Sequence, residues 1–154
     1  MNYIKSIFVL FVLLSSTVTS FAQGKVFATD QNVALNGYDV VSYFNQYDAV
    51  RGSNEHTVTV DGTTYYFNSA ENASAFEANP SAYQPAYGGY CAFAVAMKGA
   101  KVPSDPQTFK IRDGKLYLFF NDYYEGKPFN TIIPWNGNEV ELVTKANINW
   151  KNLK

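Results

Sequence analysis

The sequence predicts an α+β fold, in which a small antiparallel sheet built from two hairpins is covered by about three helices. Two strand–turn–strand patterns predict the hairpins, and three stretches with helix-start or helix-stop residues predict the helices. The chain has 154 residues, of which 47% are hydrophobic, and this is enough for one core. Twelve Tyr and twelve Phe can close that core or line a pocket.

Residues 1–22 have the pattern of a secretory signal peptide. Lys5 supplies a positive start, and the apolar run at residues 7–14 is too short to cross a bilayer comfortably. Ser20 and Ala22 then place small residues at the two positions that a signal peptidase reads. We therefore expect residues 23–154 to be periplasmic or secreted, with no membrane span. An uncleaved N-terminal anchor is the alternative.

The first hairpin is predicted at residues 56–60 and 63–67. Its strands are rich in Thr, Val and Tyr, and the Asp61-Gly62 pair between them is typical of a two-residue hairpin turn. Upstream, residues 33–44 are apolar, and their end fits either a strand or one helical turn.

The first helix is predicted to begin after Ser69, whose hydroxyl caps it, with Asn72 at the third helical position. Asn79 precedes a proline, and because such a residue is disfavoured in a helix, we expect the helix to end there. Residues 80–85 are expected to form a bend.

The second helix is predicted from Gly89 or Tyr90 to Lys98, with Gly99 as its stop. A second hairpin of the same kind follows, and Asp113-Gly114 is its turn.

The last part of the chain is predicted to be a loop followed by a helix. Residues 121–138 are rich in Gly, Pro and Asn, which indicates a loop. Residues 139–150 form an amphipathic pattern, because apolar residues recur at helical spacing: Val140, Val143, Ala146 and Trp150.

Several motifs occur in a characteristic order along the chain. The longest spans residues 64–83 and is preceded by Asp61-Gly62. The shorter ones lie at residues 36–39, 43–44, 87–92, 105–106, 113–118 and 146–150. In order and spacing, this set resembles the exported single-domain bacterial YHS proteins, which are similar to TRASH-type metal-sensing modules. The resemblance implies one YHS-like domain over residues 23–154, with its core motif at about 37–99.

The resemblance also implies a function, since paired cysteines in many YHS domains are proposed to bind heavy metals such as copper. At the two matching positions, this chain has Asn68 and Asn72. An amide oxygen is a neutral, hard donor and a poor ligand for soft metals. We therefore expect the usual metal site of the family to be lost here.

Cys91 is the only cysteine, so it cannot form a disulfide within the chain. In the first turn of a helix, unpaired backbone N–H groups and the helix dipole favour a thiolate. Gly88 and Gly89 would let a metal or another backbone approach closely. Three interpretations stay open: a buried structural residue, a reactive or metal-binding thiol, and an intermolecular disulfide that would make a dimer.

The candidate metal ligands are Cys91, His56 and Asp39, with copper or zinc as the candidate metal. His56 is the only imidazole, and a plain surface position on a strand is the alternative for it. Asp39 follows a glycine turn, where a short acid more often makes a turn or caps a helix. One Cys and one His are half of a tetrahedral site, so we expect a two-coordinate or mixed site.

A ligand pocket is predicted around four tyrosines, with Asp39 facing it. These tyrosines are Tyr38, Tyr43, Tyr87 and Tyr90. The alternative is that they are core residues whose hydroxyls find partners inside the protein.

Two functions of different classes follow. The first is a periplasmic metal- or redox-handling accessory protein centred on Cys91, and the glycine-flanked helix start favours it. The second is a non-catalytic binding module that uses its tyrosine-rich surface for a small ligand or a partner protein. Lys and Arg are scattered singly, so we expect no nucleic-acid partner. No nucleophile, base and orienting group combine in the sequence, which favours a non-enzymatic role.

Overall fold

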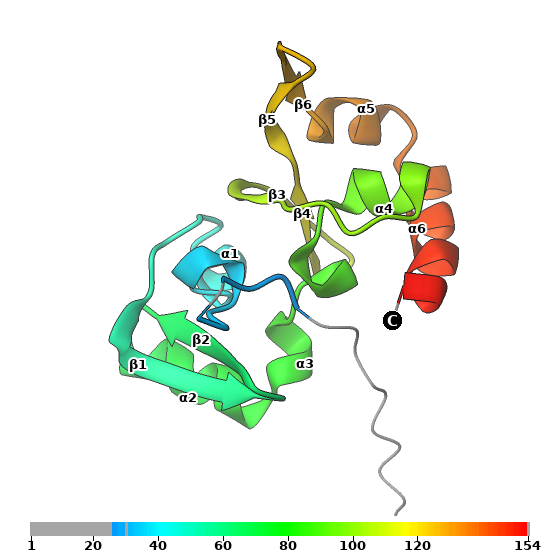
Figure 1. Ribbon diagram of the computed structural model, residues 1–154. Helices are drawn as coiled ribbons and strands as arrows, with labels where there is room; N and C mark the ends of the chain where they lie inside the picture. The colour runs from blue at the N-terminus through cyan, green and yellow to red at the C-terminus, as the bar shows by residue number, and fades with distance from the viewer. Residues whose placement is uncertain (1–25, 30, 154) are drawn as a thin grey trace, which may run out of the picture.

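The computed structural model describes residues 26–29 and 31–153, and this part of the chain forms an α+β fold (Figure 1). It contains three two-stranded antiparallel sheets and six α-helices. The predicted α+β class is confirmed, with three separate hairpins where the sequence predicted a sheet made from two. None of the described helices is long and apolar enough to cross a membrane. The predicted signal peptide lies outside the described residues.

Both predicted hairpins form. They are β1 (Ser53–Val60) with β2 (Thr63–Phe67), and β3 (Asp105–Arg112) with β4 (Lys115–Phe119). The φ angles at the turns are positive, 50° and 76° at Asp61-Gly62 and 49° and 70° at Asp113-Gly114. Asp tolerates a left-handed backbone and glycine adopts it freely, so these pairs close two-residue turns whose twist matches the strands.

The prediction of a loop at residues 121–138 is wrong. This stretch contains β5 (Asn121–Tyr124), β6 (Lys127–Asn130) and α5 (Ile132–Gly137). Glu125 and Gly126 form the turn, with φ angles of 52° and 76°. Glu lacks the short side chain that marks such turns in a sequence, so the third hairpin carried no recognisable turn signal. It projects from the rest of the molecule beside α5 (Figure 1).

The predicted first and final helices are confirmed as α2 (Ala70–Ala78) and α6 (Glu139–Leu153). The Ser69 hydroxyl accepts a hydrogen bond from the backbone N–H of Asn72 at 3.2 Å, which is the predicted cap. Residues 40–44 contain one helical turn rather than a strand.

Four shorter helical segments lie between these two helices or upstream of them. They are the 3₁₀ turn η1 (Leu35–Gly37), α1 (Ser42–Asn45), α3 (Pro80–Tyr83) within the predicted bend, and the 3₁₀ turn η2 (Ala86–Gly89). Pro80 suits the first turn of α3, where a missing N–H leaves no hydrogen bond unmade.

The second predicted helix, α4 (Ala92–Lys98), begins later than expected because η2 precedes it. Tyr87, Gly88 and Gly89 have φ angles of 54°, 62° and 83°, so the chain turns in a left-handed conformation before α4 starts. A Cβ on Gly89 would lie 2.5 Å from the Leu35 side chain, and this close approach requires glycine.

Strand β4 lies between two hydrophobic cores. Leu116 and Leu118 pack into the first core, and Tyr117 and Phe119 pack into the second. Successive side chains of a strand point to opposite faces, so a strand that is buried on both faces supplies both cores. β4 therefore connects the two halves of the molecule.

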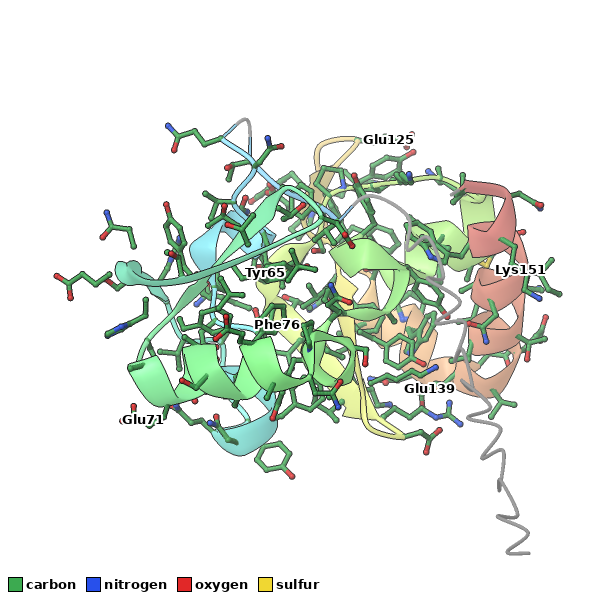
Figure 2. The ribbon with its side chains drawn as sticks, turned by 90° about the horizontal axis from the view of Figure 1, so that it is seen from below. Tyr65, Glu71, Phe76, Glu125, Glu139 and Lys151 are labelled. Carbon is green, nitrogen blue, oxygen red and sulfur yellow. The ribbon has the colours of Figure 1, made fainter. Side chains whose placement is uncertain are left out.

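The two cores join different elements. In the first core, between the β1–β2 hairpin and α2, the rings of Tyr65 and Phe76 lie 4.5 Å apart (Figure 2). In the second core, α4 packs along α6, and the fully buried Trp135 of α5 lies against Phe119. The pocket described below lies where these two halves meet.

Candidate ligand pocket

Cys91 is completely buried and directly precedes α4. Its Sγ lies 3.3 Å from Oγ1 of Thr131, and the Thr131 hydroxyl itself donates to the carbonyl of Phe120 at 2.9 Å. Since that hydroxyl hydrogen is already used, the thiol donates to Thr131. The thiol borders an apolar crevice of about 110 Å³, which is also lined by Phe93 and Phe129.

Asp39 is also fully buried, and its carboxylate accepts four hydrogen bonds. One oxygen accepts from the backbone N–H groups of Val41 and Ser42 at 2.8 and 3.3 Å. The other oxygen accepts from the backbone N–H of Asn68 at 2.9 Å and from Nδ2 of Asn72 at 2.7 Å. The structure thus places Asp39 in a turn-capping role, and the carboxylate is not part of the pockets found among the described residues.

The two asparagines that stand where the YHS pattern has cysteines belong to the same network. Nδ2 of Asn72 donates to Oδ1 of Asn68 at 3.1 Å as well as to Asp39, and Oδ1 of Asn72 accepts from Asn45 at 3.0 Å. These groups satisfy one another by hydrogen bonds.

The structure does not bring Cys91, His56 and Asp39 together. His56 is half-buried on β1, in the half of the molecule opposite to Cys91. Within residues 26–29 and 31–153, no group of three or more His, Cys, Asp or Glu side chains is placed to hold a metal ion. The prediction of one site for these three residues failed because a sequence carries no information on how far apart its residues lie in space.

Tyr43 and Tyr38 do not line the pocket around Tyr87. Tyr43 is fully buried, and its hydroxyl donates to the carbonyl of Pro106 at 2.8 Å. Burial raises the pKa of Tyr43, so this core hydroxyl stays protonated. Tyr38 lies beneath the guanidinium of Arg51, which is 4.3 Å from its ring centroid. The alternative of satisfied structural tyrosines holds for Tyr43.

Tyr90 supports the edge of the second core. Its ring lies 5.6 Å from that of Phe27 and 6.3 Å from that of Trp150. The ammonium of Lys101 is 5.7 Å from the Tyr90 centroid and 5.4 Å from the Trp150 centroid. Tyr90 therefore lies next to the pocket wall and does not form part of it.

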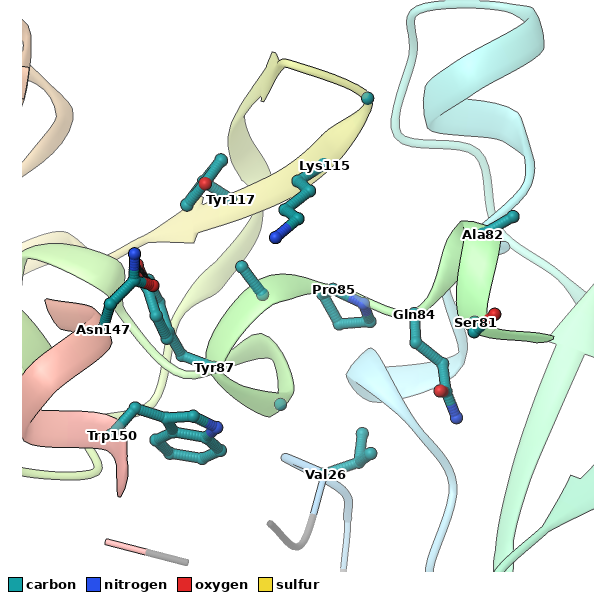
Figure 3. Close-up of a pocket in the computed structure, with 13 residues that line it drawn as sticks. Val26, Ser81, Ala82, Gln84, Pro85, Tyr87, Lys115, Tyr117, Asn147 and Trp150 are labelled. Atoms are coloured by element: carbon teal, nitrogen blue, oxygen red, sulfur yellow. Dashed lines mark hydrogen bonds between the residues drawn. The ribbon is translucent and has the colours of Figure 1, made fainter. Parts of the chain in front are cut away.

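Tyr87 is the predicted residue that lines a pocket, and the pocket has a volume of about 230 Å³ (Figure 3). Its walls come from α3 and η2, from the β3–β4 turn, and from the C-terminal part of α6. The side chains that contribute most of its chemistry are Tyr87, Lys115, Tyr117, Asn147 and Trp150. We call this space the Tyr87 pocket.

Local structure and burial explain the orientation of the aromatic groups. The positive φ of Tyr87 turns its ring toward α6, where its hydroxyl donates to Oδ1 of Asn147 at 3.1 Å. The Tyr87 ring lies 5.9 Å from that of Tyr117 and 6.1 Å from that of Trp150. Burial raises the pKa of both Tyr87 and Tyr117, so the two phenols are neutral at physiological pH.

Sequence reasoning missed four of the five main side chains of this pocket. The sequence predicts Trp150 on the apolar face of the last helix and Tyr117 in the strand that follows the Asp113-Gly114 turn. Neither assignment indicates that the β3–β4 hairpin and α6 lie next to each other at η2. The tyrosine enrichment of residues 83–90 was the one usable signal.

No protein-family model, curated protein or solved structure matches this chain. The resemblance to YHS proteins therefore stays a prediction from the motifs.

Proposed function

We propose that this chain is a non-catalytic binding module that holds a small ligand in the Tyr87 pocket. The supporting observation is that the aromatic rings of Tyr87, Tyr117 and Trp150 surround one space together with the amide of Asn147 and the ammonium of Lys115. Small-molecule sites usually combine aromatic and apolar walls with polar groups that fix the ligand, and this pocket has side chains of both kinds.

The size of the pocket limits the ligand. Its volume of about 230 Å³ is below the range of about 300–1,000 Å³ that is typical of sites for drug-sized molecules. A ligand with a single ring and one polar group fits this space better than a nucleotide or a peptide does.

A metal- or redox-handling function centred on Cys91 has less support. The thiol is buried and hydrogen-bonded to Thr131, and neither His56 nor Asp39 adjoins it among the described residues. We keep the proposal that the protein is exported, which depends on the pattern of residues 1–22 alone.

The test is a fragment screen by NMR on the ¹⁵N-labelled protein, read at the indole N–H of Trp150. Two variants place a large side chain at an exposed alanine. Ala82→Trp places an indole on the α3 wall of the pocket, and Ala78→Trp, on α2, is the matched control because Ala78 does not line the pocket.

Fragments that shift the Trp150 signal in the wild type and in Ala78→Trp, but not in Ala82→Trp, would support the proposal. If no fragment shifts that signal, the pocket is not a ligand site. Cys91→Ser adds a further arm. Fragment binding is expected to be unchanged in this variant. Loss of fragment binding would favour a function centred on the Cys91 thiol.

A further inference from the structure

Of the described residues that line the Tyr87 pocket, Lys115 is the one charged side chain, and none of them carries a carboxylate. Among the described residues, the Lys115 ammonium takes part in no ion pair. A second ammonium, that of Lys101, lies 5.4 Å from the ring centroid of Trp150. Two acids are close to Tyr117 but do not line the pocket: Glu139 pairs with Lys110 at 3.0 Å, and Asp113, 3.2 Å from Arg112, is exposed to solvent, which screens its charge. The pocket therefore favours an anion over a cation.

Lys115, Asn147 and Trp150 place hydrogen-bond donors at the pocket wall. Oδ1 of Asn147 accepts from Tyr87, which leaves the Nδ2 group of Asn147 as a donor. In Figure 3 the amino group of Lys115 points from β4 toward the segment of Pro85 and Tyr87, and the indole nitrogen of Trp150 is on the side of its ring that faces Val26. Such a wall matches a ligand group that accepts hydrogen bonds.

Part of the remaining wall is apolar and flat. The indole of Trp150 and the side chains of Val26 and Pro85 border the space opposite β4. An aromatic or other planar body can pack against these groups, whereas a small hydrated anion would leave them facing water.

We propose that the ligand is a small carboxylate with a planar apolar body, its carboxylate facing Lys115 and its body lying against Trp150. This inference rests on the proposed binding function. Lys115 is the one ammonium among the described lining residues, and it matches a single negative charge. Phosphate, which carries more charge, is usually held by arginine forks or by loops of backbone N–H groups. The pocket volume of about 230 Å³, which suits a ligand with one ring, agrees with this assignment.

The experiment compares benzoate, benzamide and inorganic phosphate as probes, with dissociation constants measured by NMR titration. Benzamide has the same ring without the charge. Lys115→Met removes the ammonium at an exposed position, and Lys127→Met, on the third hairpin, is the matched control. Benzoate is expected to bind more tightly than benzamide, and Lys115→Met to weaken benzoate about threefold to tenfold without affecting benzamide. Added salt should weaken benzoate binding alone.

Three other results would overturn the carboxylate inference. Equal binding of benzoate and benzamide, unchanged by Lys115→Met, would overturn the carboxylate inference and leave the proposed ligand site intact. Phosphate binding more tightly than benzoate would also overturn it. If benzoate binds equally well to Ala82→Trp, which changes the α3 wall of the pocket, it binds elsewhere, and the inference fails. The fragment screen decides the proposed function separately.

Discussion

At the scale of single residues, Asp39 shows how a buried charge organises the chain around it. A carboxylate removed from water is costly unless hydrogen bonds replace its hydration. Here two backbone N–H groups of the following turn, the backbone N–H of Asn68 and the amide of Asn72 supply those bonds. The network connects the segment before α1 to the end of β2 and to the start of α2. Asp39, a candidate metal ligand, is thus a structural partner of Asn68 and Asn72, which stand at the cysteine positions of the YHS pattern.

We expect Asp39→Asn to lower the free energy of unfolding by about 2–4 kcal/mol, because one oxygen that accepts two hydrogen bonds becomes an NH₂ group facing donors. Urea unfolding at pH 7 measures the change. Asp122→Asn is the matched control, since Asp122 is exposed and bonds only its own neighbour, and it should change stability by less than about 0.5 kcal/mol. Similar effects of the two substitutions would contradict a structural role for Asp39.

At the scale of secondary-structure elements, Glu139 fastens the start of α6 to the β3–β4 hairpin. Its carboxylate accepts from Lys110 and from the indole of Trp135, both at 3.0 Å, and lies 3.3 Å from the guanidinium of Arg112. A negative charge in the first turn also interacts favourably with the helix dipole. Because α6 supplies Asn147 and Trp150 to the Tyr87 pocket, this attachment helps to define the pocket wall.

The pKa of Glu139 gives this attachment a pH dependence. Partial burial raises the pKa, but hydrogen bonds from Lys110 and Trp135 and the charges of Lys110 and Arg112 outweigh it, so the pKa falls below the ordinary 4.5. A depressed carboxyl pKa stabilises the fold above the unfolded-state value, and this stabilisation is lost as the pH falls through the folded-state pKa.

We therefore expect Glu139→Gln to lower the free energy of unfolding by about 1–2 kcal/mol at pH 7, and the difference from wild type to shrink at pH 3. Urea unfolding at the two pH values measures both differences. Glu77→Gln is the control, because Glu77 is exposed on α2 and should show little change at either pH. A difference that is the same at pH 7 and pH 3 would exclude the charge of Glu139 as its cause.

At the scale of the whole molecule, β4 makes one folding unit from two cores. Leu116 and Leu118 belong to the first core, and Tyr117 and Phe119 to the second, so neither core is complete without this strand. Both tryptophans, Trp135 and Trp150, belong to the second core. Tryptophan fluorescence therefore reports on the second core, even when a substitution is made in the first.

We expect Phe76→Leu, in the first core, to destabilise the protein by about 1–2 kcal/mol and to shift the tryptophan fluorescence transition with it. Far-UV circular dichroism, which follows the helices and strands of both halves, should give the same midpoint in urea. If the fluorescence midpoint stays at the wild-type value while the circular dichroism curve splits into two steps, the cores unfold independently.

The sequence by itself determined the α+β class and the elements whose signals are local. The Asp61-Gly62 and Asp113-Gly114 turns, the Ser69 cap and the stop at Gly99 all depend on interactions within a few residues, so they can be read along the chain. The third hairpin was missed because its turn begins with Glu125 and lacks such a residue signal.

Only the tertiary structure decided which residues share a site. Cys91 was separated from His56 and Asp39, and Tyr43 was buried in the core, because burial depends on contacts between distant segments. The Tyr87 pocket joins η2 to β4 and to α6, whose Trp150 is far from Tyr87 in sequence. The periodicity of a strand or helix shows that one face is covered, but not which segment covers it. Which segments cover β4 is decided only when the whole chain folds and both faces of this strand become buried.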